Sequence, residues 1–154
     1  MIITKRIQYW IPVFLWMGLT YLMSTASFSA EHTSLIIEPI LRFLFPSISL
    51  HELHLVHGVI RKLAHLTEYF VLSLLLFRAF RGGSTEPHFW KWALYSVLVV
   101  ACYAASDEFH QMYVASRTSS IIDVGIDTLG GILGLCVSSA WQLRRRHSHG
   151  VDTR

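Results

Sequence analysis

Four ionisable side chains stand at helical spacing in the first half of an otherwise apolar stretch. The stretch from Arg61 to Phe77 reads RKLAHLTEYFVLSLLLF, and its first half carries Arg61, Lys62, His65 and Glu68. Lysine and arginine bind phosphate and carboxylate groups through charge-assisted hydrogen bonds. A histidine beside a carboxylate can transfer protons. The stretch therefore indicates a site for an anionic group or a general acid–base pair.

Two more polar groups lie next to the apolar stretches that follow. Asp107, Glu108 and Gln111 stand at the end of one stretch, whereas Asp123 and Asp127 stand near the beginning of the last. An ionisable group inside a membrane is costly when left alone, so such groups face inward and pair with one another.

The composition indicates a membrane protein. Of the 154 residues, 53% are hydrophobic and 15% are charged, whereas roughly 25% of the residues of a soluble domain are charged. A single domain over residues 1–154 is expected. The net charge of +3 comes mainly from basic residues beside the apolar stretches, so we predict no nucleic-acid partner.

The fold class predicted is all-α, with four transmembrane helices. A span needs about 20 mostly apolar residues, and stretches of this kind cover 7–28, 59–80, 89–108 and 120–143. Residues 29–58 carry a polar stripe interrupted by Pro39 and Pro46, which indicates one or two short helices in the membrane interface. The first stretch also has the features of a signal peptide, and we favour a retained helix.

The basic residues predict that both termini are cytoplasmic. Cytoplasmic flanks are rich in lysine and arginine. With the N-terminus inside, nine of the 13 basic residues fall on the inner side and four on the outer side. The basic tail 144–154 then lies in the cytoplasm, where we expect it to contact anionic lipid head groups. The localisation predicted is the bacterial cytoplasmic membrane.

This orientation places the ionisable residues in one layer. With a rise of about 1.5 Å per residue, all of them fall in the outer part of the membrane. We therefore predict a polar pocket open to the outer face. Its candidate residues are Arg61, Lys62, His65, Glu68, Asp107, Glu108, Gln111, Arg117, Asp123 and Asp127. On the same face of the last stretch, Gly130 and Gly134 permit close helix packing, and through them oligomerisation.

The chain resembles the VanZ-like family of small bacterial membrane proteins, over most of its length. The resemblance is strongest in RKLAHLTEY and in SDEFHQMYVASRTSSIIDVGIDTLGGILG. The matching positions are Lys62, His65, Asp107, Glu108, Gln111, Arg117, Asp123, Val124 and Gly130. The family is named for a member linked to teicoplanin resistance, so the resemblance implies a role in the envelope without supplying a reaction. The family commonly has asparagine where this chain has Asp127, and Pro-Gly where it has Ala115-Ser116.

Several residues have simpler interpretations. Ser120 and Asp123 fit a capping box, and Lys62 fits an interfacial anchor whose stem lies in lipid. Glu68 could pair with Lys62 or His65 of its own helix. Asp107 and Glu108 could lie at the end of a helix that is exposed to solvent. The segment HELHLVH departs from the His-Glu-x-x-His spacing of metalloproteases, so we predict no metal and no cofactor.

Three functions remain open. The first is a binding protein for the head group of a membrane lipid or a lipid-linked amphiphile. The second is an enzyme acting on such a head group, with His65 as general acid or base and Glu68, Asp107, Glu108 or Asp127 as its partner. The third and weakest is a proton- or ion-coupled carrier, because buried carboxylates often mark such paths.

Overall fold

The described part of the computed structural model contains five helices. The structure describes residues 2–25, 30–82, 89–114 and 119–151, and no strand occurs among them. The helices are α1 (Ile2–Met23), α2 (Ala30–Leu44), α3 (Leu50–Arg81), α4 (Phe89–Gln111) and α5 (Ile121–Val151). The all-α class is confirmed.

Three of these helices are long and apolar enough to cross a membrane. They are α3, α4 and the part of α5 over Ile121–Trp141. The apolar part of α1, Ile7–Met23, is shorter. Three of the four predicted spans are therefore matched by such helices, and the first is matched by this shorter apolar helix.

Helix α1 is integrated into the bundle. Val13, Thr20 and Ser24 are buried. The indole nitrogen of Trp16 donates a hydrogen bond of 2.9 Å to the backbone carbonyl of Glu68 in α3. From α4, the hydroxyl of Tyr103 donates one of 2.6 Å to the carbonyl of Met17. Helix α1 therefore contacts both α3 and α4, and its retention as a helix stays a prediction.

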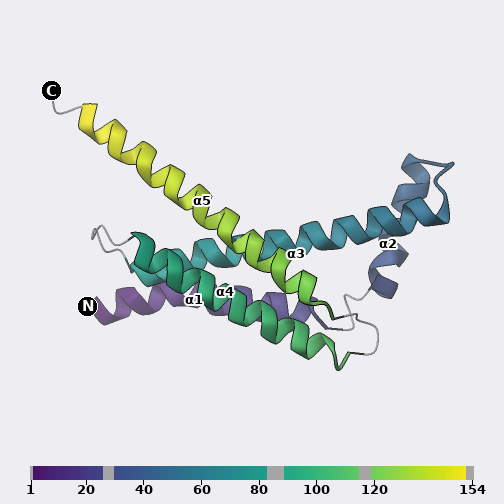
Figure 1. Ribbon diagram of the computed structural model, residues 1–154, viewed down its shortest axis with the longest axis horizontal. Coiled ribbons are helices and arrows are strands. Elements are labelled where there is room, and N and C mark those ends of the chain that lie inside the picture. Colours follow the sequence, from purple (N-terminus) through teal and green to yellow (C-terminus); the bar gives the residue numbers. More distant parts are fainter. Residues whose placement is uncertain (1, 26–29, 83–88, 115–118, 152–154) are drawn as a thin grey trace.

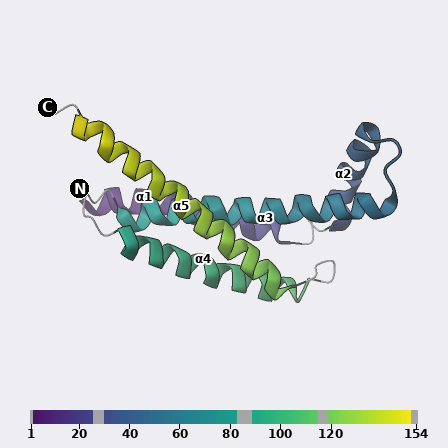
Figure 2. The same ribbon diagram turned by 45° about the horizontal axis from the view of Figure 1, so that its top comes forward.

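Helix α3 is the centre of the arrangement, because it contacts all four other helices. Its 32 residues correspond to a length of about 48 Å, which exceeds the roughly 30 Å of a bilayer core. Its first part extends beyond α4 and α5, and α2 lies beside that projecting part (Figure 1). Helix α1 begins and α5 ends at the opposite end of the molecule (Figure 1, Figure 2).

Helix α3 begins at Leu50, before the predicted span 59–80, so part of the segment predicted as a connection belongs to this helix. Ser49 caps the helix: its hydroxyl accepts a hydrogen bond from the backbone N–H of Glu52, whose carboxylate accepts one from the backbone N–H of Ser49. This reciprocal pair satisfies two backbone donors at once. Hydropathy does not predict this first part of the helix, because the residues after Ser49 are too polar to belong to the apolar stretch.

Helices α3 and α5 approach each other through two glycines. A side chain added at Gly130 would overlap the backbone carbonyl of Leu66. One added at Gly134 would overlap the hydroxyl of Ser73 and the backbone carbonyl of Phe70. The glycine face predicted for oligomerisation is thus covered by α3 of the same chain, and association with other copies stays a prediction.

We expect Gly130→Ala to lower the stability of the fold. The new methyl group meets backbone, which cannot rotate away, so the cost is about 1–3 kcal/mol. Gly125→Ala is the matched control, because no atom lies within 4 Å of a side chain added there. The measurement is thermal unfolding in detergent. Equal melting temperatures for the two variants would contradict the close contact between the helices.

Candidate functional site

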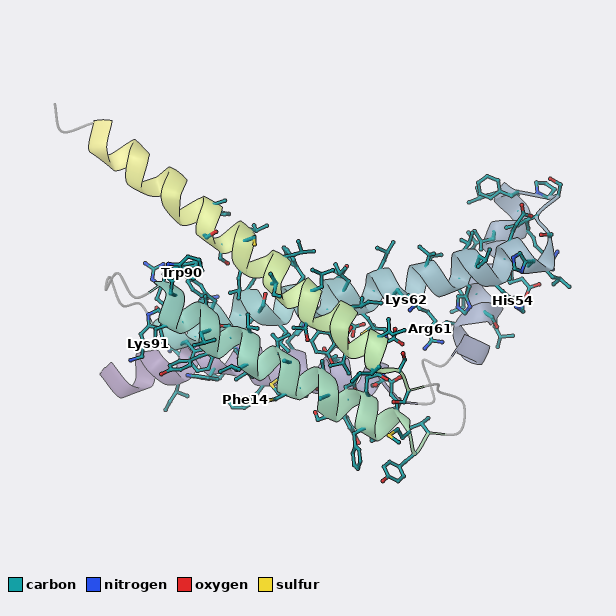
Figure 3. All side chains as sticks on the ribbon, viewed as in Figure 1. Phe14, His54, Arg61, Lys62, Trp90 and Lys91 are labelled. Atoms are coloured by element: carbon teal, nitrogen blue, oxygen red, sulfur yellow. The ribbon has the colours of Figure 1, made fainter. Side chains whose placement is uncertain are left out.

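A cavity of about 160 Å³ lies between α3, α4 and α5. Its lining is formed by Gly58, Arg61, Lys62, His65, Gln111, Asp123, Ile126 and Asp127. Six of these eight are among the predicted site residues. Figure 3 shows two of them, Arg61 and Lys62, on α3 near the beginning of α5.

The part of the cavity nearer the beginnings of α3 and α5 is called the outer layer, and the next turn of both helices the inner layer. The outer layer contains a salt bridge between the two helices. Lys62 Nζ of α3 lies 3.0 Å from Asp123 Oδ1 of α5. Arg61 lies next to this pair and has no carboxylate partner among the residues that the structure describes. Lys62 is therefore neutralised by a neighbour, and Arg61 leaves a net positive charge at this level.

The inner layer lies one helical turn away, since His65 follows Arg61 by four residues and Asp127 follows Asp123 by four. A turn rises 5.4 Å. Asp127 is completely buried, with 0% of its surface exposed. His65 Nδ1 lies 3.7 Å from Asp127 Oδ1, which is too far for a hydrogen bond. Neither carboxylate oxygen of Asp127 has a hydrogen-bond partner in the described part of the chain.

Gln111 connects the cavity to α1 and to a second buried carboxylate. Its amide nitrogen donates hydrogen bonds of 2.7 Å to Ser24 Oγ and 3.1 Å to Asp107 Oδ2. Both amide hydrogens are thereby used, so its carbonyl oxygen is the group left to accept a bond at the cavity. Asp107 is buried beneath the lining, and its Oδ1 has no partner among the described residues.

Glu108 has a structural role that the sequence did not reveal. Its Oε2 accepts a hydrogen bond of 2.7 Å from the backbone N–H of Ser120, just before α5. The Ser120–Asp123 capping box is therefore wrong, because Glu108 takes the place that Asp123 would occupy and Asp123 binds Lys62 instead. Asp107 and Glu108 are both 4% exposed, which also excludes a solvated helix end.

The remaining candidates lie elsewhere. Glu68 is half-buried on α3 and does not line the cavity. Arg117 and the Ala115-Ser116 departure lie outside the described residues. In the segment HELHLVH, His57 shares a hydrogen bond of 3.0 Å with Thr33 of α2. His54 lies on the projecting part of α3, away from Arg61 and Lys62 (Figure 3). A ligand-binding role for the lining residues stays a prediction.

We expect Asp127→Asn to fold with unchanged or higher stability. The two side chains have nearly the same shape, and the change removes a buried charge that has no hydrogen-bond donor. Asp127→Leu should be less stable, because a larger apolar side chain must fit beside Gln111 and His65. Thermal unfolding in detergent compares the three proteins. A marked loss of stability in Asp127→Asn would show that the charge itself supports the fold.

The comparisons with known proteins agree with the sequence pattern. The family model described as VanZ/LLP1 matches residues 9–142, which include every residue that lines the cavity. No curated protein and no solved structure matches the chain. The matched range covers most of the 154 residues, and the chain therefore belongs to the VanZ/LLP1 family of membrane proteins.

Proposed function

We propose that this membrane protein binds the polar head group of a lipid or another amphiphile in the cavity between α3, α4 and α5. The observation that carries the proposal is the guanidinium of Arg61, which lines the cavity without a carboxylate partner in the described part of the chain. A charge within the membrane requires a partner, and a guanidinium binds phosphate or carboxylate through paired hydrogen bonds. An anionic head group supplies that partner.

The surface around the cavity suits a ligand with an apolar tail. Large hydrophobic side chains are exposed next to the lining residues, among them Val59, Leu63 and Ile122. In a membrane, such side chains contact acyl chains. The head group of an amphiphile would lie in the polar cavity, and its tail would lie along these apolar side chains.

The orientation forms part of the proposal: four spans, both termini cytoplasmic, and the cavity open to the outer side. The beginning of α1 and the end of α5 lie at one end of the molecule (Figure 1), as an even number of spans requires. Arg78 and Arg81 lie near that end, in the last turn of α3, where the preference for basic residues on the cytoplasmic side puts them.

Labelling of single cysteines tests this orientation. The background has Cys102→Ser and Cys136→Ser, because both native thiols are free and exposed. In intact cells, a membrane-impermeant thiol reagent should label His54→Cys and Tyr113→Cys but not Arg81→Cys. The last should react only after the membrane is opened. Labelling of Arg81→Cys in intact cells would reverse the orientation and place the cavity at the inner face.

We expect Arg61→Gln to weaken the binding of a phosphate-bearing lipid by at least about tenfold, because a hydrogen bond to a charged group contributes roughly 1.5–3 kcal/mol. Arg78→Gln is the matched control: it removes the same charge from α3, where the guanidinium stacks over Tyr9 at 5.3 Å. The measurement is titration of the detergent-purified protein with phosphatidylglycerol. Equal affinities for the two variants would contradict an anion site at Arg61.

A second candidate is an enzyme that modifies such a head group. The observation that favours it is the proximity of His65 to buried Asp127, at 3.7 Å, since a histidine oriented by a carboxylate is a common general acid or base. A lipid profile of cells with and without the protein distinguishes the two. An enzyme leaves a missing product or an accumulated substrate, whereas a binding protein leaves the lipid composition unchanged. A role in teicoplanin resistance stays a prediction from the family.

A further inference from the structure

The inner layer of the cavity contains two buried carboxyl groups, Asp107 and Asp127, and His65 Nδ1 lies 3.7 Å from Asp127 Oδ1. Asp127 is fully buried at the cavity wall, and Asp107 is buried directly behind Gln111. No lysine or arginine in the described ranges forms an ion pair with either carboxylate. Both oxygens of Asp127 lack a hydrogen-bond donor there. A buried polar group usually has a hydrogen-bond partner, and a ligand in the cavity could supply one to Asp127.

The acceptors at this level fit a primary ammonium group. An ammonium donates three hydrogen bonds. Asp127 offers two oxygens, and Gln111 offers its carbonyl oxygen because Ser24 and Asp107 hold its amide hydrogens. A metal ion fits less well, since no group of three His, Cys, Asp or Glu side chains within the described ranges could hold one.

A quaternary ammonium lacks N–H donors and is recognised by aromatic rings. Among the residues that the structure describes, none of those lining the cavity is phenylalanine, tyrosine or tryptophan. The lining therefore favours a primary amine over a choline-like group, although the two carry the same charge.

We infer that the inner layer binds a primary ammonium group, held by Asp127 and Gln111, of a ligand whose anionic group lies at Arg61. This inference rests on the proposed function. The two layers are one helical turn apart, about 5.4 Å, which suits a short linker between the anionic and cationic groups. A phosphate joined to a primary amine by two carbons has this form, and it occurs both in lipid head groups and as free phosphoethanolamine.

The test compares four probes on the full chain purified in detergent, with affinities measured by native mass spectrometry. The probes are short-chain phosphatidylethanolamine, phosphatidylcholine and phosphatidylglycerol, and free phosphoethanolamine. The protein should prefer phosphatidylethanolamine to phosphatidylcholine by at least about tenfold, the effect of one hydrogen bond to a charged group. Comparable binding of free phosphoethanolamine would identify the soluble compound as sufficient, and weaker binding would identify the lipid.

Asp127→Asn should abolish this preference while retaining affinity for phosphatidylglycerol, which needs only the outer layer. Glu38→Gln is the matched control: it removes a carboxylate from α2, which does not line the cavity, and should keep the preference. Thermal unfolding verifies that both variants fold.

Each remaining outcome has a distinct meaning. A preference that persists in Asp127→Asn, or equal affinities of the unmodified protein for phosphatidylethanolamine and phosphatidylcholine, overturns the ammonium site, and phosphatidylglycerol binding then still supports the proposed function. Failure of all four probes to bind overturns both.

Discussion

The close contact between α3 and α5 determines the rest of the structure. At Gly130 and Gly134 the absence of a side chain lets α5 lie directly on the backbone of α3. Since both helices are regular, this contact also fixes which residues face one another in the preceding turns. Lys62 then meets Asp123, and His65 lies beside Asp127. The cavity lies between these two helices and the end of α4.

The polar residues around the cavity fall into two groups with different physical roles. One group connects elements: Glu108 binds the backbone before α5, and Gln111 joins α4 to α1 through Ser24. Both are satisfied by partners inside the fold. The other group lines the cavity: among the described residues, Arg61 has no carboxylate partner and Asp127 has no hydrogen-bond partner. In a low-dielectric environment such groups are costly, and a ligand that offers complementary charges would offset that cost.

Much of the architecture could be predicted because a membrane constrains sequence strongly. Apolar stretches revealed α3, α4 and α5, and helix rise alone indicated that Lys62, Asp107 and Asp123 lie at similar depth. The beginning of α3 could not be found in this way, because Ser49 and Glu52 stabilise a helix in a segment that is not apolar. Hydropathy measures how apolar a segment is, whereas a helix cap stabilises the helix through local hydrogen bonds. A capped polar segment is therefore not detected by hydropathy.

The pairing of individual side chains in the candidate site could not be predicted from the spacing of residues in the sequence. The sequence could place Glu108 and Asp123 in the same layer, but the choice of partner depends on helix rotation and register. These are set by packing at Gly130 and Gly134. The capping box at Ser120 was therefore a reasonable local prediction that a tertiary contact from Glu108 overrode. Likewise, the fact that no described residue donates a hydrogen bond to Asp127 can be seen only once its neighbours are in place.

The register between α3 and α5 is the central claim, and cross-linking in native membranes tests it most directly. In a background with Cys102→Ser and Cys136→Ser, cysteines replace Lys62 and Asp123, whose side chains meet at 3.0 Å. A control pair replaces Lys62 and Ile122, because the Ile122 side chain is 66% exposed. A short bifunctional thiol reagent should cross-link the first pair efficiently and the second poorly. Equal cross-linking of the two pairs, or preference for the control pair, would contradict this register and the two-layer cavity that depends on it.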